Sequence, residues 1–141
     1  MRLEITRRTD LATRALLALG DADADRRTKA AALADEVGTT PGFLSQPMSP
    51  LVARGSVRSD PGPTGGYRLV ADLTQVSVLD VIEAVEGPTD DGRCVLEDRA
   101  CAVAGRGTCA LHQPWVHARA DLLGRLEATP LAGPRAQAPR P

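Results

Sequence analysis

The chain of 141 residues suits one domain, or one small domain with an appendage, and its 43% hydrophobic but only 2% aromatic content requires a core of Leu, Val and Ala. The net charge of −1 is unevenly spread, because residues 1–70 carry ten Lys and Arg against eight Asp and Glu, whereas residues 71–141 carry seven against ten. No segment is apolar enough for a membrane span or a signal peptide, so we expect a cytoplasmic protein with reduced thiols and no membrane partner.

Residues 4–20 are predicted to form the first helix. Leu11, Ala15 and Leu19 recur at four-residue spacing and give this segment one apolar face. Thr9 is the expected N-cap, which leaves Asp10 in the first turn, and a glycine at position 20 is the expected stop.

Two short helices follow, over residues 29–37 and from Pro41 onward. Thr28 is the expected cap of the former helix and Thr40 the expected cap of the latter, with Pro41 in its first turn. A tight turn containing Gly38 joins the two helices. This arrangement is typical of a helix-turn-helix, whose second helix enters the major groove of DNA.

The second helix of this pair has two predicted faces. Its apolar residues are expected to face inward: Phe43, Leu44, Leu51 and Val52. Its outer residues would be free for phosphates and base edges: Thr40, Gly42, Ser45, Gln46 and Ser49. Pro47 and Pro50 lie inside the helix, where proline removes a backbone hydrogen bond. The sequence therefore predicts a kink at these prolines or a shorter helix.

A hairpin is predicted after Gly55. The β-type runs SVRSD and YRLV flank the turn PGPTGG, as in the wing of a winged helix. Arg58 and Arg68 would flank the tip, with Thr64 in the turn, where these side chains can reach phosphates or a minor groove. The helix-turn-helix and the hairpin, in this order, predict a mainly α fold with a small β-wing that binds double-stranded DNA.

Two more helices are predicted in the second half of the chain. Residues 74–87 form one of them, with Ser77 as cap and Gly87 as stop. Residues 114–128 form the other, a long C-terminal helix that carries an apolar stripe of Trp115, Ala118, Leu122 and Leu126. This stripe predicts a homodimerisation helix, and packing onto the chain's own domain is the alternative.

The three cysteines lie together between these two helices. Cys94, Cys101 and Cys109 are spaced C-x6-C-x7-C, and His112 follows at C-x2-H. Clustered cysteines in a reducing compartment indicate metal binding or redox chemistry rather than structural disulfides. Soft thiolates suit an iron–sulfur cluster. A structural zinc site is an alternative that the irregular spacing argues against, and a cluster-free thiol sensor is another.

We therefore expect three parts along the chain. Residues 1–72 form a winged helix-turn-helix DNA-binding domain, residues 73–129 form a cluster-binding loop with dimerisation helices, and residues 130–141 form a disordered tail. No nucleophile elbow, phosphate loop or HExxH motif is present in the sequence. The chain is therefore predicted not to be an enzyme.

The order of these parts resembles the bacterial family of dimeric winged-helix repressors that includes IscR and NsrR. The resemblance covers residues 1–129, and its most specific pieces are MRLEITRRTDLATRALLAL, GPTGGYRL, SVLDVIEAVEG and the three-cysteine loop followed by CALHQPW. It implies a dimeric operator-binding repressor whose 2Fe–2S or 4Fe–4S cluster responds to nitric oxide, iron status or redox stress.

The resemblance also implies a set of cluster ligands. The three cysteines match the cluster thiolates, and two residues match the fourth ligand in different branches of the family. His112 fits the IscR-like C-x2-H, whereas Asp10 fits the NsrR-like aspartate that the partner subunit's first helix donates. Each residue also has a purely structural interpretation, with His112 opening the last helix and Asp10 paired with Arg14 at i+4.

The chain departs from this family at three points. Its cysteine spacing is longer than in either branch, Pro61 stands where IscR-like proteins have a wing arginine, and Pro47 interrupts the recognition helix. The operator sequence of the family therefore does not transfer to this chain.

Overall fold

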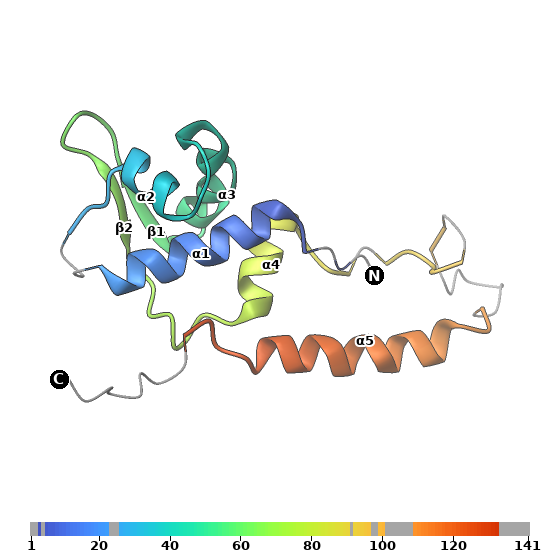
Figure 1. Ribbon diagram of the computed structural model, residues 1–141. Helices are drawn as coiled ribbons and strands as arrows, with labels where there is room; N and C mark the ends of the chain where they lie inside the picture. The colour runs from blue at the N-terminus through green and yellow to red at the C-terminus, as the bar shows by residue number, and fades with distance from the viewer. Residues whose placement is uncertain are drawn as a thin grey trace.

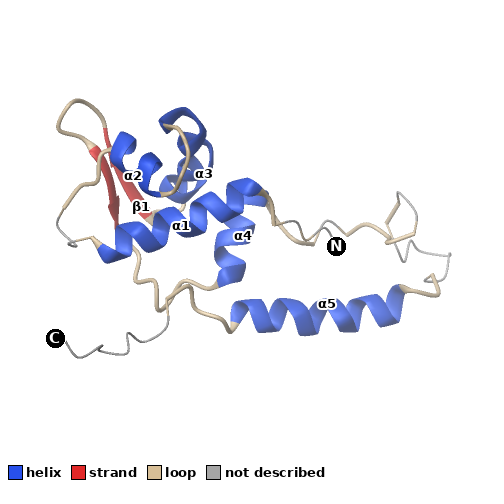
Figure 2. Ribbon diagram, viewed as in Figure 1, coloured by secondary structure: helices blue, strands red, loops and turns tan. Residues whose placement is uncertain are grey.

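The computed structural model describes residues 3, 5–22, 26–90, 92–96, 99–100 and 109–132. These residues form five helices and one two-stranded antiparallel sheet, shown in Figures 1 and 2. In chain order the elements are α1 (Arg7–Asp21), α2 (Ala30–Glu36), α3 (Pro41–Ala53), β1 (Val57–Asp60), β2 (Gly66–Leu69), α4 (Val78–Glu86) and α5 (His112–Glu127). The predicted mainly α fold with a small wing is confirmed.

The core lies around α1, which contacts α2, α3, α4 and β2. The largest fully buried side chains include Leu16, Leu33, Leu44, Met48 and Ile82. The expected aliphatic core is therefore confirmed. Among the residues that the structure describes, no helix is long and apolar enough to cross a membrane.

The first helix begins at Arg7, three residues after the start of the predicted range, and its N-cap is Thr6 instead of Thr9. Thr6 Oγ1 accepts the N–H of Arg8 at 3.1 Å. Thr9 is buried inside α1 and donates its hydroxyl to Oε1 of Glu86 at 2.7 Å. The predicted cap at Thr9 is wrong, because this hydroxyl forms a hydrogen bond with a residue of α4.

Gly20 also has a different role from the predicted one. Helix α1 continues one residue beyond it, to Asp21. A Cβ atom at Gly20 would lie 2.8 Å from Cδ1 of Leu73. This glycine therefore allows the close approach of Leu73 and does not stop the helix.

The two caps predicted for the helix-turn-helix have different outcomes. Thr40 caps α3 as predicted, because its Oγ1 accepts the N–H of Phe43 at 3.3 Å. The cap predicted for α2 is wrong, because Lys29 occupies the N-cap position. Thr28 instead exchanges two backbone hydrogen bonds with Tyr67, at 2.9 and 2.8 Å, and so lies beside the wing.

The inner face of α3 differs from the prediction at its first turn. Leu44 and Leu51 are buried and Val52 is partly buried, as predicted, but Phe43 is 62% exposed. The buried positions Leu44, Met48 and Leu51 recur at spacings of four and three residues, which define one helical face. Phe43 lies outside that face, so its predicted inward orientation is wrong.

The two prolines inside α3 do not end it. The helix continues through Pro47 and Pro50 to Ala53. Each proline lacks the N–H that would bond the carbonyl one turn earlier. Pro47 is fully buried, so its ring adds apolar contacts where a hydrogen bond is missing. The predicted shortening of the helix is therefore wrong.

Helix α4 joins the winged helix to the remainder of the chain. Ser77 caps it as predicted and forms a capping box with Asp80, and Gly87 ends it with a φ of 90°. Val81 and Val85 belong to the same core as α1 and α3.

The segment after α5 returns to the start of α4. Pro130 pairs with Ser77, and the N–H of Leu131 donates to the carbonyl of Val76 at 2.7 Å. Leu131 and Ala132 pack against the core. The first residues of the expected disordered tail are thus hydrogen-bonded to the domain, and the rest of that tail, residues 133–141, lies outside the described residues.

Helix α5 is present at the predicted place and lies apart from α1, α2 and α3 in Figure 1. It contacts α4, and none of its sixteen residues is buried. Trp115 and Leu122 of the predicted apolar stripe are 36% and 37% exposed. Part of the apolar surface of this stripe is therefore left exposed by the chain's own domain.

Candidate DNA interface and thiol pocket

The outer face of α3 displays the residues predicted to meet DNA. Gly42, Ser45, Gln46 and Ser49 are exposed. The Ser45 hydroxyl donates to the carbonyl of Gly42 at 2.7 Å. A Cβ atom at Gly42 would have no heavy atom within 4 Å, so another molecule can approach the backbone there. Thr40 is exposed as well, although its hydroxyl is occupied by the helix cap.

Phe43 is a surface residue that the sequence interpretation assigned to the core. It lies on α3 next to Gly42 and three residues before Gln46, so it shares the outer face of the helix. An exposed aromatic side chain at this place can contact a thymine methyl group. The four-residue spacing from Leu44 to Met48 was the signal that could have placed Phe43 outside the core.

The wing carries the other residues predicted to meet DNA. Arg58 and Arg68 are directly opposite each other in the β1–β2 register, and Thr64 is exposed in the turn. Strand β1 contacts α3, and Figure 1 shows the wing loop at the same end of the molecule as α2 and α3. The recognition helix and the wing can therefore face one ligand.

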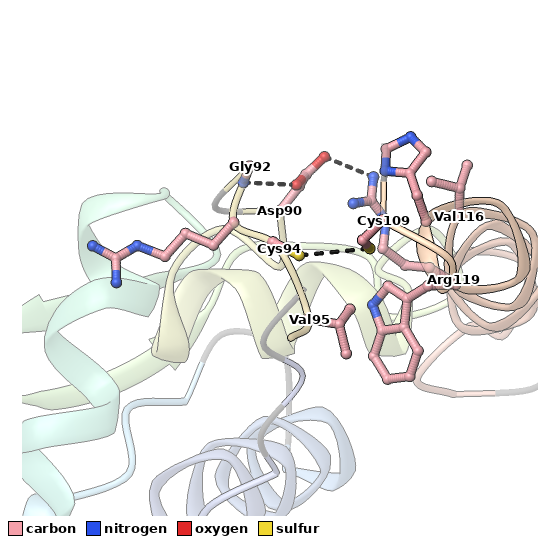
Figure 3. A pocket seen from close by; sticks show the side chains of 10 residues that line it. Asp90, Gly92, Cys94, Val95, Cys109, Val116 and Arg119 are labelled. Carbon is pink, nitrogen blue, oxygen red and sulfur yellow. Dashed lines mark hydrogen bonds and ion pairs between the residues drawn. The ribbon is translucent and has the colours of Figure 1, made fainter. Parts of the chain in front are cut away.

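The thiol pocket is the second candidate site, shown in Figure 3. Cys94 and Cys109 are fifteen residues apart in the chain, yet their Sγ atoms lie 3.6 Å apart. Cys94 Sγ also accepts the N–H of Leu96 at 3.4 Å. Both thiols and His112 line a cavity of about 240 Å³ at the start of α5.

An ion pair joins two residues that line this cavity. Arg119 Nη2 lies 2.6 Å from Oδ2 of Asp90, and the N–H of Gly92 donates to Oδ1 of Asp90 at 3.0 Å. The hydrogen bond from Arg119, followed by that from Gly92, lowers the pKa of Asp90. The carboxylate is therefore charged at neutral pH and ties the linker after α4 to α5.

The structure brings together only some of the predicted ligands. Cys94, Cys109 and His112 share the cavity, whereas Cys101 lies outside the described residues. Asp10 does not line the cavity, and its Oδ1 lies 3.2 Å from Nε of Arg14 on the surface of α1. Within the described part of the chain, no group of three or more His, Cys, Asp and Glu side chains could hold a metal ion.

The sequence interpretation assigned no role at this site to the other residues that line the cavity, among them Asp90, Arg93, Trp115 and Arg119. The spacing of Trp115 marked it only as part of a dimer stripe. No local pattern indicates the pairing of Asp90 with Arg119, because the two residues are 29 positions apart.

Comparison with known proteins identifies the family. Residues 5–133 match the Rrf2 family, described as iron-dependent transcriptional regulators. A protein of Mycobacterium tuberculosis named as an HTH-type transcriptional regulator is 31% identical over 92% of this chain and 80% of its own length. IscR from Vibrio atlanticus is 35% identical over 59% of this chain and 46% of its own length.

A solved structure supports the fold. CymR, the global cysteine regulator of Bacillus subtilis, superimposes with a TM-score of 0.70 at 24% identity, over 92% of this chain and 94% of CymR. These similarities confirm the predicted resemblance and agree with a regulator rather than an enzyme. The chain belongs to the Rrf2 family of winged-helix transcriptional regulators.

Proposed function

We propose that the chain is a dimeric repressor whose affinity for operator DNA is controlled by an iron–sulfur cluster at the thiol pocket. The 3.6 Å separation of the Cys94 and Cys109 Sγ atoms is the observation that carries this proposal. Two thiolates on one tetrahedral metal ion, each about 2.3 Å from the metal, lie about 3.8 Å apart. The two sulfur atoms thus have a spacing that suits binding to the same metal atom.

The donor set fits the cluster in kind. Cys94, Cys109 and Cys101 would supply three thiolates, and His112 lines the cavity as a candidate fourth ligand. Asp10 is the other candidate, and it would have to come from a second subunit because it does not line this cavity. A cluster bound there would supply a metal centre sensitive to nitric oxide, iron supply or oxidants.

The linker after α4 can transmit a change at this pocket to the DNA-binding head. The N–H and hydroxyl of Thr89 donate to Oε1 of Glu83 on α4, at 3.2 and 2.8 Å. One residue later, Asp90 pairs with Arg119 on α5. Helix α4 packs against α3, so the linker connects the pocket to a helix that contacts the recognition helix.

The exposed stripe on α5 supports a dimer. A second copy packed on Trp115 and Leu122 would cover apolar surface that this chain leaves exposed. Two recognition helices must lie one helical turn of DNA apart, about 34–36 Å, to enter successive half-sites. A change in the relation between α5 and the head alters this spacing and therefore the affinity for DNA.

The short distance between the two thiols also supports a second candidate function, a cluster-free redox sensor. A disulfide requires the two Sγ atoms to approach to about 2.05 Å, a small movement from 3.6 Å. Oxidation by a peroxide would join Cys94 to Cys109 with the release of water. The family offers relatives for both candidates, because similar proteins include IscR and the cysteine regulator CymR.

Metal analysis of anaerobically purified protein separates these functions. We expect iron and acid-labile sulfide together with visible absorbance, and we expect a changed spectrum in either His112→Ala or Asp10→Ala. Zinc without sulfide would contradict the cluster, as would metal-free protein that gains one disulfide with peroxide. A spectrum unchanged in both variants would contradict the proposed fourth ligands.

A further inference from the structure

Several arginines lie in a row on the outer face of the wing, and one aspartate contacts two of them. Val57 is 2% exposed and faces the core. Successive side chains of a strand point to opposite faces, so Arg58 and Asp60 point away from the core. Arg68 lies directly opposite Arg58 on β2 and shares this outer face.

A third arginine joins the row from the segment before α2. The bridge between Thr28 and Tyr67 is antiparallel. Continuing its register by one residue places Arg27 level with Arg68, on the side of β2 opposite to β1. Arg58, Arg68 and Arg27 thus form one row across three adjacent backbone segments, which we call the arginine row.

Asp60 holds two members of this row. Its Oδ2 lies 2.9 Å from Nε of Arg27, and its Oδ1 lies 3.6 Å from Nε of Arg58. Asp60 pairs with Gly66, so no side chain of β2 stands between the carboxylate and Arg27. Glycine is required there, because a Cβ atom at Gly66 would lie 2.4 Å from the carbonyl oxygen of Thr28.

The contact with Asp60 leaves donors of both arginines available. Oδ2 of Asp60 is buried and accepts no aligned hydrogen bond among the described atoms, so Arg27 meets it through charge. A guanidinium group has five N–H donors. The side chains of Arg27 and Arg58 remain 47% and 62% exposed. Both can therefore donate to another anion while Asp60 fixes their position.

Among the described residues, the charges of the row are not balanced. Three positive charges face the single negative charge of Asp60, and Arg68 has no ion-pair partner among the described residues. Like charges directly opposite each other on neighbouring strands are destabilising. Guanidinium groups match the oxygens of a phosphate. A polyanion bound on this face would remove the repulsion.

We propose that the arginine row binds the phosphate backbone of duplex DNA beside the site read by α3. This proposal rests on the proposed DNA-binding function and adds Arg27 as a contact and Asp60 as its positioning residue. The chain has Pro61 at the wing tip in place of an arginine. The row supplies basic contacts from the face of the wing instead of its tip.

Salt-dependent binding of the full chain tests the row. Anisotropy is measured between about 50 and 200 mM salt. One duplex spans the promoter of the chain's own gene, and a second is a scrambled duplex of equal composition. We expect Arg27→Ala and Arg68→Ala each to reduce the slope of log K against log salt by about 0.9 per bound head, equally on both duplexes. Asp60→Asn removes the charge that fixes Arg27 and Arg58, so it should also reduce this slope on both duplexes.

Two control variants make the test specific. Arg125→Ala removes an exposed arginine from α5 and should keep the wild-type slope. Arg26→Ala removes the neighbouring charge, which would point to the opposite side if the segment before α2 alternates as an extended chain does. The proposal is overturned if Arg27→Ala and Arg68→Ala keep the wild-type slope. It is also overturned if Arg26→Ala reduces the slope as much as they do. A wild-type chain that binds neither duplex overturns the DNA-binding function itself.

Discussion

Adjacent residues on α3 illustrate how burial separates stability from recognition. Leu44 is fully buried in the core, whereas Phe43 is 62% exposed beside the outer polar residues. Truncating a buried leucine removes packing and leaves a cavity. Truncating an exposed side chain costs little stability, so an effect on binding can be measured without a folding defect.

We therefore predict opposite effects of two alanine variants. Leu44→Ala should lower the free energy of unfolding by about 2–5 kcal/mol. Phe43→Ala should change it by no more than about 0.5 kcal/mol but weaken binding to duplex DNA. Urea denaturation measures the free energy of unfolding, and anisotropy of the duplex measures the affinity for DNA. A destabilised Phe43→Ala variant with unchanged DNA affinity would show that Phe43 belongs to the core.

At the scale of elements, periodicity and glycine or proline positions predicted the helices and the hairpin correctly. The caps predicted at Thr9 and Thr28 were wrong, because contacts with residues distant in the sequence do not show in a local pattern. The hydroxyl of Thr9 serves Glu86 from a distant helix, and the backbone of Thr28 pairs with Tyr67. The clustering of cysteines predicted that Cys94 and Cys109 lie close together, but the pair of Asp90 and Arg119 depends on how α5 lies beside the linker.

The ion pair between α5 and the linker gives a prediction at this scale. Asp90 is about half exposed, so Arg119→Ala should cost no more than about 1 kcal/mol of stability. The same variant should lose iron to a chelator faster, because the linker is no longer tied to α5. Arg125→Ala is the matched control, since it breaks the Asp121 pair on the same helix away from the cavity. Equal rates of iron loss in the two variants would contradict this role.

The direction of the Asp90 pKa shift sets the pH range of this contact. Its folded pKa is lowered by Arg119 and Gly92, so the contact contributes stability above the unfolded pKa of about 3.9. That contribution is lost as the pH falls through the lower folded pKa. The difference in stability between wild type and Arg119→Ala should therefore be constant near neutral pH and disappear only in acid.

At the scale of the whole molecule, the proposed dimer depends on the exposed stripe of α5. We predict that Leu122→Glu converts a dimer into a folded monomer, because a charge on the exposed stripe is incompatible with an apolar interface. Val70→Glu is the control, since Val70 is also exposed but lies outside α5. Sedimentation velocity measures the mass of each variant. A Leu122→Glu chain that remains dimeric would place the interface elsewhere.

The affinity for DNA with and without the cluster tests the proposed regulator most directly. Binding to the promoter duplex is measured under anaerobic conditions before and after removal of iron with a chelator. We predict a change of about 5–150-fold, which corresponds to a coupling of about 1–3 kcal/mol. The change should be absent in a variant that carries both Cys94→Ser and Cys109→Ser. Equal affinities of the iron-loaded and iron-free wild type would contradict control of DNA binding by this pocket.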